Sequence, residues 1–582
     1  MKIRSARSQK KTWSIAPTAE NAADFARTLN ISPILAQVLI NRGVTDEAKA
    51  QSFLAPKLVD LIAPEEMPGA TKAAQRILQA VANDEKIAIY GDYDVDGITS
   101  VTILWHLLTI MEAQVEYYIP HRIDEGYGLN DNAIKQLAET GVDLIITVDC
   151  GINAFAAANL AAGLGVDLII TDHHQIADGK LPTATAVVHP LLEESYDNPH
   201  SCGAMVAFKL AWAVIKQNLG NRQTPPELRQ YLLNATTLAA IGTIADVVDL
   251  RGENRVLTSY GLKALPQSKL TGILALIQSS GLGEQAIDSY HIAFRLAPML
   301  NAAGRMGHAR LAVELLTSDS EMRCTQIAEY LKEQNKLRQK CQRDIYKQAR
   351  ELVTLKGYNH PDRKTIVLAS DTWHSGVIGI VASRIVEDYC RPAILINSQE
   401  KICAGSARSL PGFNMHEAIG ACSELLEGFG GHEMAAGLRI QNEKIDEFAD
   451  AFEEYALGNL KEELLVSKLK IDALCNIGGF NQNVIKQLGL LDPSGQGNRK
   501  PVFATKGVRL IAPPRKVGAK GDHLQLSIRD NTGSVRCIGF NMGRLEKKLQ
   551  EVESFSVAYE PKMNHYNGNS TVQFVLEDIQ FG

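Results

Sequence analysis

Four groups of acidic residues and histidines in the first half of the chain have the composition of a metal centre. They are Asp92, Asp94 and Asp96 in the motif GDYDVDG, Asp149, the run Asp172-His173-His174, and Asp246 in IADVV. Carboxylate oxygen and imidazole nitrogen together suit Mn²⁺ or Mg²⁺ better than a metal that prefers thiolates. Two such ions about 3.5–4 Å apart catalyse hydrolysis of phosphate esters. The residue types therefore predict a two-metal hydrolytic centre.

Each group by itself has an ordinary explanation. A D-x-D sequence is common in solvated turns, a single aspartate at a strand end says little, and paired histidines are more often surface or core residues than ligands. Three groups at the ends of three strands of one sheet are hard to explain in this way. We therefore interpret the groups together as metal ligands.

The elements expected to position these residues alternate between short apolar runs and helix-like segments over residues 81–250. The predicted strands are 86–91, 115–120, 142–149, 166–171 and 185–190. This alternation predicts a doubly wound α/β domain with a parallel sheet, and runs that are apolar at every position predict helices on both faces. Ligands of such sheets bind outside the carboxyl ends of the strands, where we expect all four groups.

The rest of the 582 residues predicts further domains. Residues 1–80 are expected to be a helical segment, and 251–355 a helical region that contains NAAGRMG and ends in a long, basic connecting helix. A smaller α/β domain is expected over 356–460. Over 468–582, five short β-like runs separated by polar turns predict a small OB-like barrel.

Composition limits the protein class. A hydrophobic content of 45% excludes disorder over most of the chain, and no apolar run reaches the roughly 18 residues of a membrane span. The basic start is not followed by an apolar stretch, and the nine cysteines contain no C-x-x-C pair, so a reduced, cytoplasmic protein is expected. The net charge of −6 leaves nucleic-acid binding open, because a local basic groove can exist in a mildly acidic protein.

Several motifs resemble those of the DHH/DHHA1 phosphoesterase superfamily. The sequences GDYDVDG, VDCG and TDHH resemble the DHH motifs, and GGHEMAAG at 430–437 is similar to the DHHA1 signature. The segments RLAPMLNAAGRMG, WHSGVIGIVASR and LDPSGQGNRKP are similar to the RecJ family of bacterial single-strand-specific exonucleases. The resemblance covers about residues 80–582. It implies a DHH domain, a DHHA1 domain joined to it by a long helix, and a C-terminal OB-like domain that binds nucleic acid.

The resemblance also implies roles for individual residues. The implied metal ligands are Asp94, Asp96, Asp149, His173 and Asp246, with Asp149 bridging two Mn²⁺ or Mg²⁺ ions. Asp92 is a further ligand or positions water, and His174 lies near the scissile phosphate. Phosphate contacts call for arginine forks, polar side chains and close backbone approach. The implied substrate-binding residues are Asn301, Arg305, Arg384, Ser406, Arg408, Gly431 and His432.

The implied activity is degradation of single-stranded DNA from 5′ to 3′ into 5′-mononucleotides, in recombination and repair. Family membership also implies a single-strand-binding protein and a RecQ-type helicase as partners, with a monomer as the default state. Two alternatives stay open: a nanoRNase or nucleotide phosphatase of the same superfamily, and a non-catalytic DNA-binding scaffold. The first would cleave a dinucleotide but not a 30-mer, and scaffolds of this kind lose metal ligands.

Overall fold

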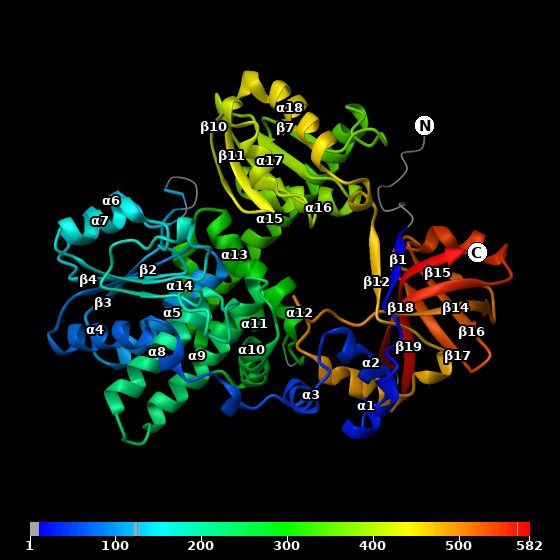
Figure 1. Cartoon of the computed structure of the whole chain (residues 1–582), viewed down its shortest axis with the longest axis horizontal. Coiled ribbons are helices and arrows are strands. Elements are labelled where there is room, and N and C mark those ends of the chain that lie inside the picture. The colour runs from blue at the N-terminus through cyan, green and yellow to red at the C-terminus, as the bar shows by residue number, and fades with distance from the viewer. Residues whose placement is uncertain (1–10, 122–124, 127, 284, 567–568, 582) are drawn as a thin grey trace. The chain divides into compact units, whose positions relative to one another are not determined.

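The computed structural model describes residues 11–121, 125–126, 128–283, 285–566 and 569–581 (Figure 1). The chain forms two compact units. The larger unit contains Ile15–Lys332 and the chain from Ile471 onward, and the smaller contains Glu333–Lys470 with the strand residues before Ile15. Among the described residues, no helix combines the length and the apolar character needed to cross a bilayer.

A five-stranded, fully parallel sheet forms the first half of the larger unit, in the order β3-β2-β4-β5-β6. Its strands are β2 Ile87–Gly91, β3 Val115–Tyr118, β4 Leu144–Val148, β5 Asp167–Thr171 and β6 Ala186–Val188. One face packs on α4 Ala70–Ala82, α5 Val95–Ile110 and α8 Gly203–Leu219, and the other on α6 Asp131–Glu139 and α7 Phe155–Gly163 (Figure 1). Every residue of β2 and β4 is buried as a result, which confirms the doubly wound α/β domain.

A layer of helices extends the core of this domain beyond residue 219. The helices are α9 Pro226–Ala245, α10 Gly252–Ala264, α11 Thr271–Ser279, α12 Ser289–His291, α13 Ala297–Arg305, α14 Ala309–Thr317 and α15 Glu321–Leu355. Helices α14 and α15 are separate, because Ser318 between them adopts an extended conformation. Its hydroxyl accepts a hydrogen bond from the backbone N–H of Ser320 just before α15 begins. The 35-residue α15 is the expected long connecting helix.

The C-terminal part of the larger unit is a closed ring of strands. Its strands are β13 Ala473–Leu474, β14 Phe503–Leu510, β15 Arg515–Val517, β16 His523–Arg529, β17 Ser534–Gly539, β18 Phe555–Tyr566 and β19 Asn569–Phe581. Because β14 pairs with both β18 and β16, the order β14-β18-β19-β17-β16 closes on itself. Two short helices, α19 Gln482–Leu488 and α20 Glu546–Gln550, complete this part.

The N-terminal helices share a core with this barrel. They are α1 Ala22–Leu29, α2 Pro33–Asn41 and α3 Glu47–Leu54. Leu35, Leu39 and Phe53 from these helices belong to the same apolar cluster as Phe503 and Phe574 of the barrel. The start of the chain therefore contributes to the stability of the C-terminal domain.

Arg255 on α10 ties three parts of the larger unit together. Its side chain is only 2% exposed, and its guanidinium lies 4.0 Å from the ring of Phe53. It donates hydrogen bonds of 2.7–2.9 Å to the backbone carbonyls of Phe53, Leu490, Leu491 and Asp492. The helical layer of the α/β domain is thus bonded both to α3 and to the loop that leads into the barrel.

The smaller unit contains a mixed sheet in the order β10-β11-β9-β8-β7, in which only β7 and β8 are parallel. Its strands are β7 Ile366–Ser370, β8 Ala393–Asn397, β9 Ile402–Arg408, β10 Leu426–Gly431 and β11 Ala435–Gln441. Helices α17 Met415–Gly420 and α18 Ile445–Asn459 cover one face. On the other face, α16 Ser375–Tyr389 and the end of α15 pack on β7 and β8. Strand β1 Thr12–Ile15 pairs with β12 Lys468–Ile471.

Candidate metal centre and phosphate-binding residues

Three of the four predicted ligand groups lie where adjacent strands end. Asp92 follows β2, Asp149 follows β4 and Asp172 follows β5, and these three strands are neighbours in the sheet. Asp246 lies at the same edge of the sheet, but it follows the last turn of helix α9. Its predicted position at the end of a strand is therefore wrong. The α/β fold and the helical layer therefore build this edge together.

Backbone N–H groups hold two of the carboxylates in place. Asp94 caps the N-terminus of α5, where its Oδ1 accepts hydrogen bonds from the N–H of Asp96 (2.9 Å) and Gly97 (3.1 Å). The carboxylate of Asp96 accepts from the N–H of Gly203 (2.6 Å) and Ala204 (2.9 Å) at the start of α8. Helix N-termini stabilise negative charge, so two helices fix these carboxylates before any cation binds.

The two histidines are held differently. The buried carboxylate of Asp172 accepts hydrogen bonds from the N–H of Ile152 (2.9 Å) and from Nδ1 of His174 (2.7 Å). His173 instead points into the acidic cluster. Its Nε2 lies 3.1 Å from Oδ1 of Asp149 and 3.7 Å from a carboxylate oxygen of both Asp96 and Asp246.

The cluster suits divalent cations. Burial, and then the neighbouring carboxylates Asp96 and Asp94, raise the pKa of Asp149 well above its usual range, and the same causes raise the pKa of Asp246 to about 9. Burial lowers the pKa of His173, which favours a neutral imidazole. In the described part of the chain, Nε2 of His173 is buried and makes no hydrogen bond. A neutral imidazole among crowded carboxylates is the donor set of an oxygen-rich cation site.

The donor atoms form overlapping groups. In each, the candidate ligand atoms lie within 4.8 Å of one another: Asp92, Asp94 and Asp149; Asp96, His173 and Asp246; and Asp149, His173 and His174. Asp149 belongs to two of these groups and is next to the third through His173. Asp149 is therefore the carboxylate that the groups of candidate ligands share most closely.

The backbone at Asp149 is forced into an unusual conformation. Its φ of 62° lies in the left-handed region, which non-glycine residues rarely adopt. The side chain is then directed against Gly203: a Cβ at residue 203 would lie 2.6 Å from Cβ and 2.8 Å from Cγ of Asp149. Only glycine at 203 leaves room for the carboxylate.

We expect Gly203→Ala to lower the rate of the phosphate-ester hydrolysis expected at this centre by about 100-fold, because an ångström-scale displacement of a reacting group costs about that much. Gly163→Ala is the matched control, since nothing lies within 4 Å of a Cβ at that helical position. Steady-state rates and thermal midpoints of both variants are the measurement. Equal rates for the two variants would show that the position of Asp149 does not limit activity.

Helix α13 places Asn301 and Arg305 beside the metal edge. Oδ1 of Asn301 accepts a hydrogen bond from the N–H of Val95 at 3.2 Å. A Cβ at Gly304 would lie 2.4 Å from the carbonyl oxygen of Tyr93, so the helix contacts the loop of the D-x-D motif directly. The structure therefore brings the NAAGRMG motif together with the segment that carries Asp94 and Asp96.

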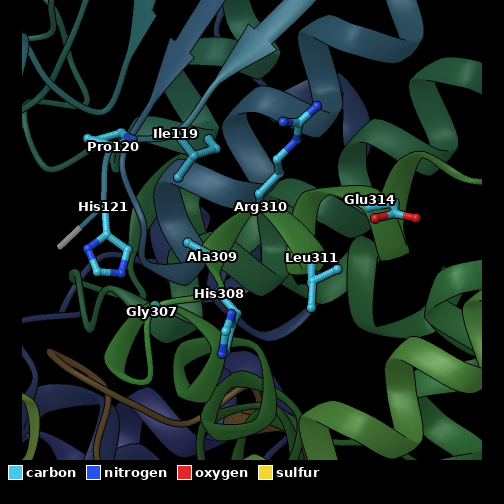
Figure 2. A pocket seen from close by; sticks show the side chains of 10 residues that line it. Ile119, Pro120, His121, Gly307, His308, Ala309, Arg310, Leu311 and Glu314 are labelled. Carbon is cyan, nitrogen blue, oxygen red and sulfur yellow. The ribbon is translucent and has the colours of Figure 1, made fainter. Parts of the chain in front are cut away.

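A pocket of about 270 Å³ next to this helix was not predicted from the sequence (Figure 2). Among its lining residues are His121, just beyond β3, and His308 and Arg310 at the junction of α13 and α14. Gly307 allows the close contact, because a Cβ there would lie 2.6 Å from Nε2 of His121. The available signal was the sequence His-Arg directly after the predicted strand 115–120, at the same sheet edge as the acidic groups.

In the smaller unit, Ser406 and Arg408 lie on the same face of β9. Nη1 of Arg408 donates a hydrogen bond to Oγ of Ser406 at 3.1 Å. Gly379 of α16 lies against both, since a Cβ there would be 2.8 Å from Oγ of Ser406 and 2.9 Å from Nη2 of Arg408. The sequence prediction missed this glycine, whose signal was its place in WHSGVIGIVASR.

Glycines on β11 and β10 leave space beside Ser406. Gly437 of β11 pairs with Ser406, and Gly430 of β10 pairs with Gly437. Both glycines are exposed, with no atom closer than 3.9 Å to a Cβ at either position. Gly431 has a φ of 139°, and the N–H of His432 bonds to the carbonyl of Ala435 in the same hairpin.

Arg384 on α16 contacts an aromatic ring. Its guanidinium lies 3.9 Å from the ring centroid of Tyr346 on α15. The hydroxyl of Tyr346 is in turn hydrogen-bonded to Asp388. Of the three predicted arginines, one therefore lies beside the metal edge, one beside Ser406 and one on an aromatic ring.

Three family models match the chain. The model described as "DHH family, N-terminal domain" matches residues 86–242, "DHHA1 domain" matches 362–457, and "RecJ OB domain" matches 471–578. These matches agree with the sheet of the larger unit, the sheet of the smaller unit and the closed ring of strands.

Comparisons over nearly the whole chain also find RecJ proteins. A relative named single-stranded-DNA-specific exonuclease RecJ, from Bacillus subtilis, is 37% identical over 573 residues, which cover 98% of this chain and 71% of the relative. The crystal structure of RecJ with Mn²⁺ from Thermus thermophilus superposes with a TM-score of 0.83 at 30% identity, covering 98% of this chain and 80% of that one. The corresponding Mg²⁺ complex has a TM-score of 0.78 at 29% identity, covering 98% and 78%.

Proposed function

We propose that this chain, which belongs to the RecJ family of single-stranded-DNA-specific exonucleases, hydrolyses single-stranded DNA from the 5′ end and releases 5′-mononucleotides. The observation that carries the proposal is the cluster of the buried Asp96 and Asp149 with the half-buried His173 and Asp246. Relatives of the family have been crystallised with Mn²⁺ and with Mg²⁺. We propose either metal, as two ions, for this chain.

The proposed ligands are Asp94, Asp96, Asp149, His173 and Asp246, with Asp92 as a further ligand or a group that positions water. When bound, divalent ions at such a site activate water and neutralise charge that develops on the phosphate. The chain itself supplies the fixed geometry: helix N-termini hold Asp94 and Asp96, and the conformation of Asp149 places its carboxylate between the donor groups.

His174 is suited to stabilise negative charge. Burial alone would lower its pKa, but the hydrogen bond and the charge of Asp172 outweigh burial and raise the pKa of His174 to about 9. This shift favours the protonated imidazole in the metal-free protein. We propose that it donates a hydrogen bond to the phosphate oxygen on which charge develops.

The smaller unit supplies a second set of phosphate contacts in the proposal. Arg408 and Ser406 present N–H and O–H donors on one face, next to the exposed glycines 430 and 437. Backbone without side chains lets a phosphate approach closely. We assign Ser406, Arg408, Gly431 and His432 to substrate binding by the smaller unit, and Asn301 and Arg305 to substrate binding beside the metal ligands. Arg384 is kept as a candidate phosphate contact that Tyr346 orients.

Arg408→Ala should raise KM for single-stranded DNA about 10- to 100-fold, because a charge-assisted hydrogen bond contributes about 1.5–3 kcal/mol. The rate at saturating DNA should change much less, since Arg408 is proposed to bind the substrate and is not a metal ligand. The exposed Lys461→Ala is the control for loss of one positive charge. A fall in the saturated rate at unchanged KM would contradict this role.

The location, cellular process and partners proposed for the protein rest on its membership in the RecJ family. All nine cysteines are free thiols, which supports the predicted cytoplasmic location. Recombination and repair are the processes that fit the activity, while a single-strand-binding protein, a RecQ-type helicase and a monomeric state stay predictions. The retained ligand set disfavours a non-catalytic scaffold, and the match to the RecJ OB domain disfavours a nanoRNase. Hydrolysis of an oligonucleotide that requires Mn²⁺ or Mg²⁺ and stops in EDTA tests the proposal.

A further inference from the structure

Two aromatic side chains of the larger unit are presented to solvent side by side. Tyr290 on α12 is 54% exposed and Phe294, four residues later, is 63% exposed. Their ring centroids lie 4.7 Å apart with the planes tilted by 35°. Burying either ring in the core would stabilise the fold, so a pair of adjacent exposed rings calls for an explanation.

The local backbone produces this exposure. Residues Ile292–Leu296 form a π-helical turn, in which Ile292 and Leu296 are buried in the main core while Phe294 points outward. Such turns are rare and occur frequently at functional sites. The turn leads directly into α13, the helix that carries Asn301 and Arg305.

The pair lies between the metal edge and the barrel. The turn packs against α9, the helix that ends immediately before Asp246. Next to Tyr290, the hydroxyl of Ser289 donates a hydrogen bond to the carbonyl of Ser494, in the loop that leads into the barrel. The same loop bonds to the α/β domain, because the N–H of Leu250 donates to the carbonyl of Gln496 at 2.9 Å.

A cationic group accompanies the rings. Arg295 is exposed beside Phe294 and donates one hydrogen bond, of 2.6 Å, to the carbonyl of Ser280. A guanidinium has five N–H donors, so further donors can reach a phosphate. Exposed rings with a neighbouring arginine are the combination by which proteins bind single strands without sequence preference.

We propose that Tyr290 and Phe294 form a stacking platform for the bases of the uncleaved strand, between the metal centre and the barrel, with Arg295 contacting the backbone. This inference rests on the proposed function and adds a contact to bases that the metal and phosphate sites do not provide. The platform would hold the strand while its end is hydrolysed. It would tolerate any sequence, because every base has a π face.

The test compares the double variant Tyr290→Ala/Phe294→Ala with Tyr290→Phe/Phe294→Tyr, which keeps both rings. With Mn²⁺ and a single-stranded 30-mer, loss of the rings should raise KM about 10-fold, and the ring-retaining variant should match the wild type. Leu233→Ala, an exposed apolar residue on α9, is the control for loss of apolar surface. Unchanged KM in the alanine variant would overturn the inference.

A second measurement identifies the base contact itself. A 30-mer series with a single abasic position moved along the strand should show one short window in which the missing base raises KM for the wild type. In the alanine variant the same window should have no effect, because the two losses remove one interaction. Equal effects in both proteins would overturn the stacking role. If the wild type cleaves no single-stranded DNA, the proposed function fails; if it cleaves and the variants behave alike, only the platform fails.

Discussion

Asp149→Asn should lower the turnover on single-stranded DNA by at least about 1,000-fold while DNA binding changes little. The amide keeps the shape of the side chain but cannot supply a charged oxygen to two ions, and metal-centre charge stabilisation contributes several kcal/mol. Single-turnover rates with Mn²⁺, and DNA affinity by fluorescence anisotropy, are the two measurements. Asp362→Asn, on a side chain that is 86% exposed, is the control for the amide replacement.

The same variant should behave in the opposite way when no metal is present. Burial and the neighbouring carboxylates raise the pKa of Asp149 well above its usual range, so its charge opposes folding of the metal-free protein. We therefore expect the thermal midpoint of Asp149→Asn in EDTA to rise by a few degrees, and the further rise on adding Mn²⁺ to be smaller than in the wild type. Turnover near the wild-type value, or an unchanged response to Mn²⁺, would remove Asp149 from the metal centre.

Arg255→Met should cause a large loss of stability. The variant removes the hydrogen bonds to the carbonyls of Phe53, Leu490, Leu491 and Asp492. The Leu491 carbonyl keeps a hydrogen bond from Nδ2 of Asn498, but a buried carbonyl that loses its donor, such as that of Phe53, costs about 1–3 kcal/mol. Relief from burying the guanidinium, whose pKa burial lowers to about 10, offsets part of this. We expect a net loss of about 3 kcal/mol, measured as a lower urea midpoint.

Arg251→Ala provides the comparison for Arg255. Arg251 lies one turn earlier, is 50% exposed and pairs only with Asp249 among the described residues, so its removal should cost less than about 1 kcal/mol. Limited proteolysis should also separate the two variants, because Arg255 bonds to the loop that leads into the barrel. Equal urea midpoints for the two variants would show that the carbonyl contacts do not hold these parts together.

The ligand positions that the sequence predicts well are those that directly follow a strand. Asp92, Asp149 and Asp172 directly follow apolar strands, and the geometry of a parallel sheet brings their positions together. The position of His173 at this edge is predicted in the same way, because it comes directly after Asp172. Asp246 was assigned correctly to the cluster but wrongly to a strand end, because an apolar run such as the one preceding it is compatible with a buried helix as well as a buried strand.

The remaining features depend on contacts between distant segments. Nothing in the N-terminal sequence indicates that Leu35 and Phe53 pack with the barrel. The pattern of an amphipathic helix shows that one face is buried, but not which element that face packs against. The role of Gly203 requires knowing that α8 begins against Asp149, and that of Gly379 requires knowing that α16 crosses Ser406. Likewise, the exposure of Tyr290 and Phe294 depends on a π-helical turn that hydrophobic periodicity does not predict.

The proposed activity is metal-dependent hydrolysis that begins at the 5′ end of single-stranded DNA. The most direct test is digestion of 30-mers labelled at the 5′ or the 3′ end, with Mn²⁺, Mg²⁺ or EDTA, beside a duplex control. We predict release of the 5′ label as a mononucleotide, progressive shortening of the 3′-labelled strand, intact duplex, and no reaction in EDTA. Intact single strands with both metals, or shortening that starts at the 3′ end, would contradict the account.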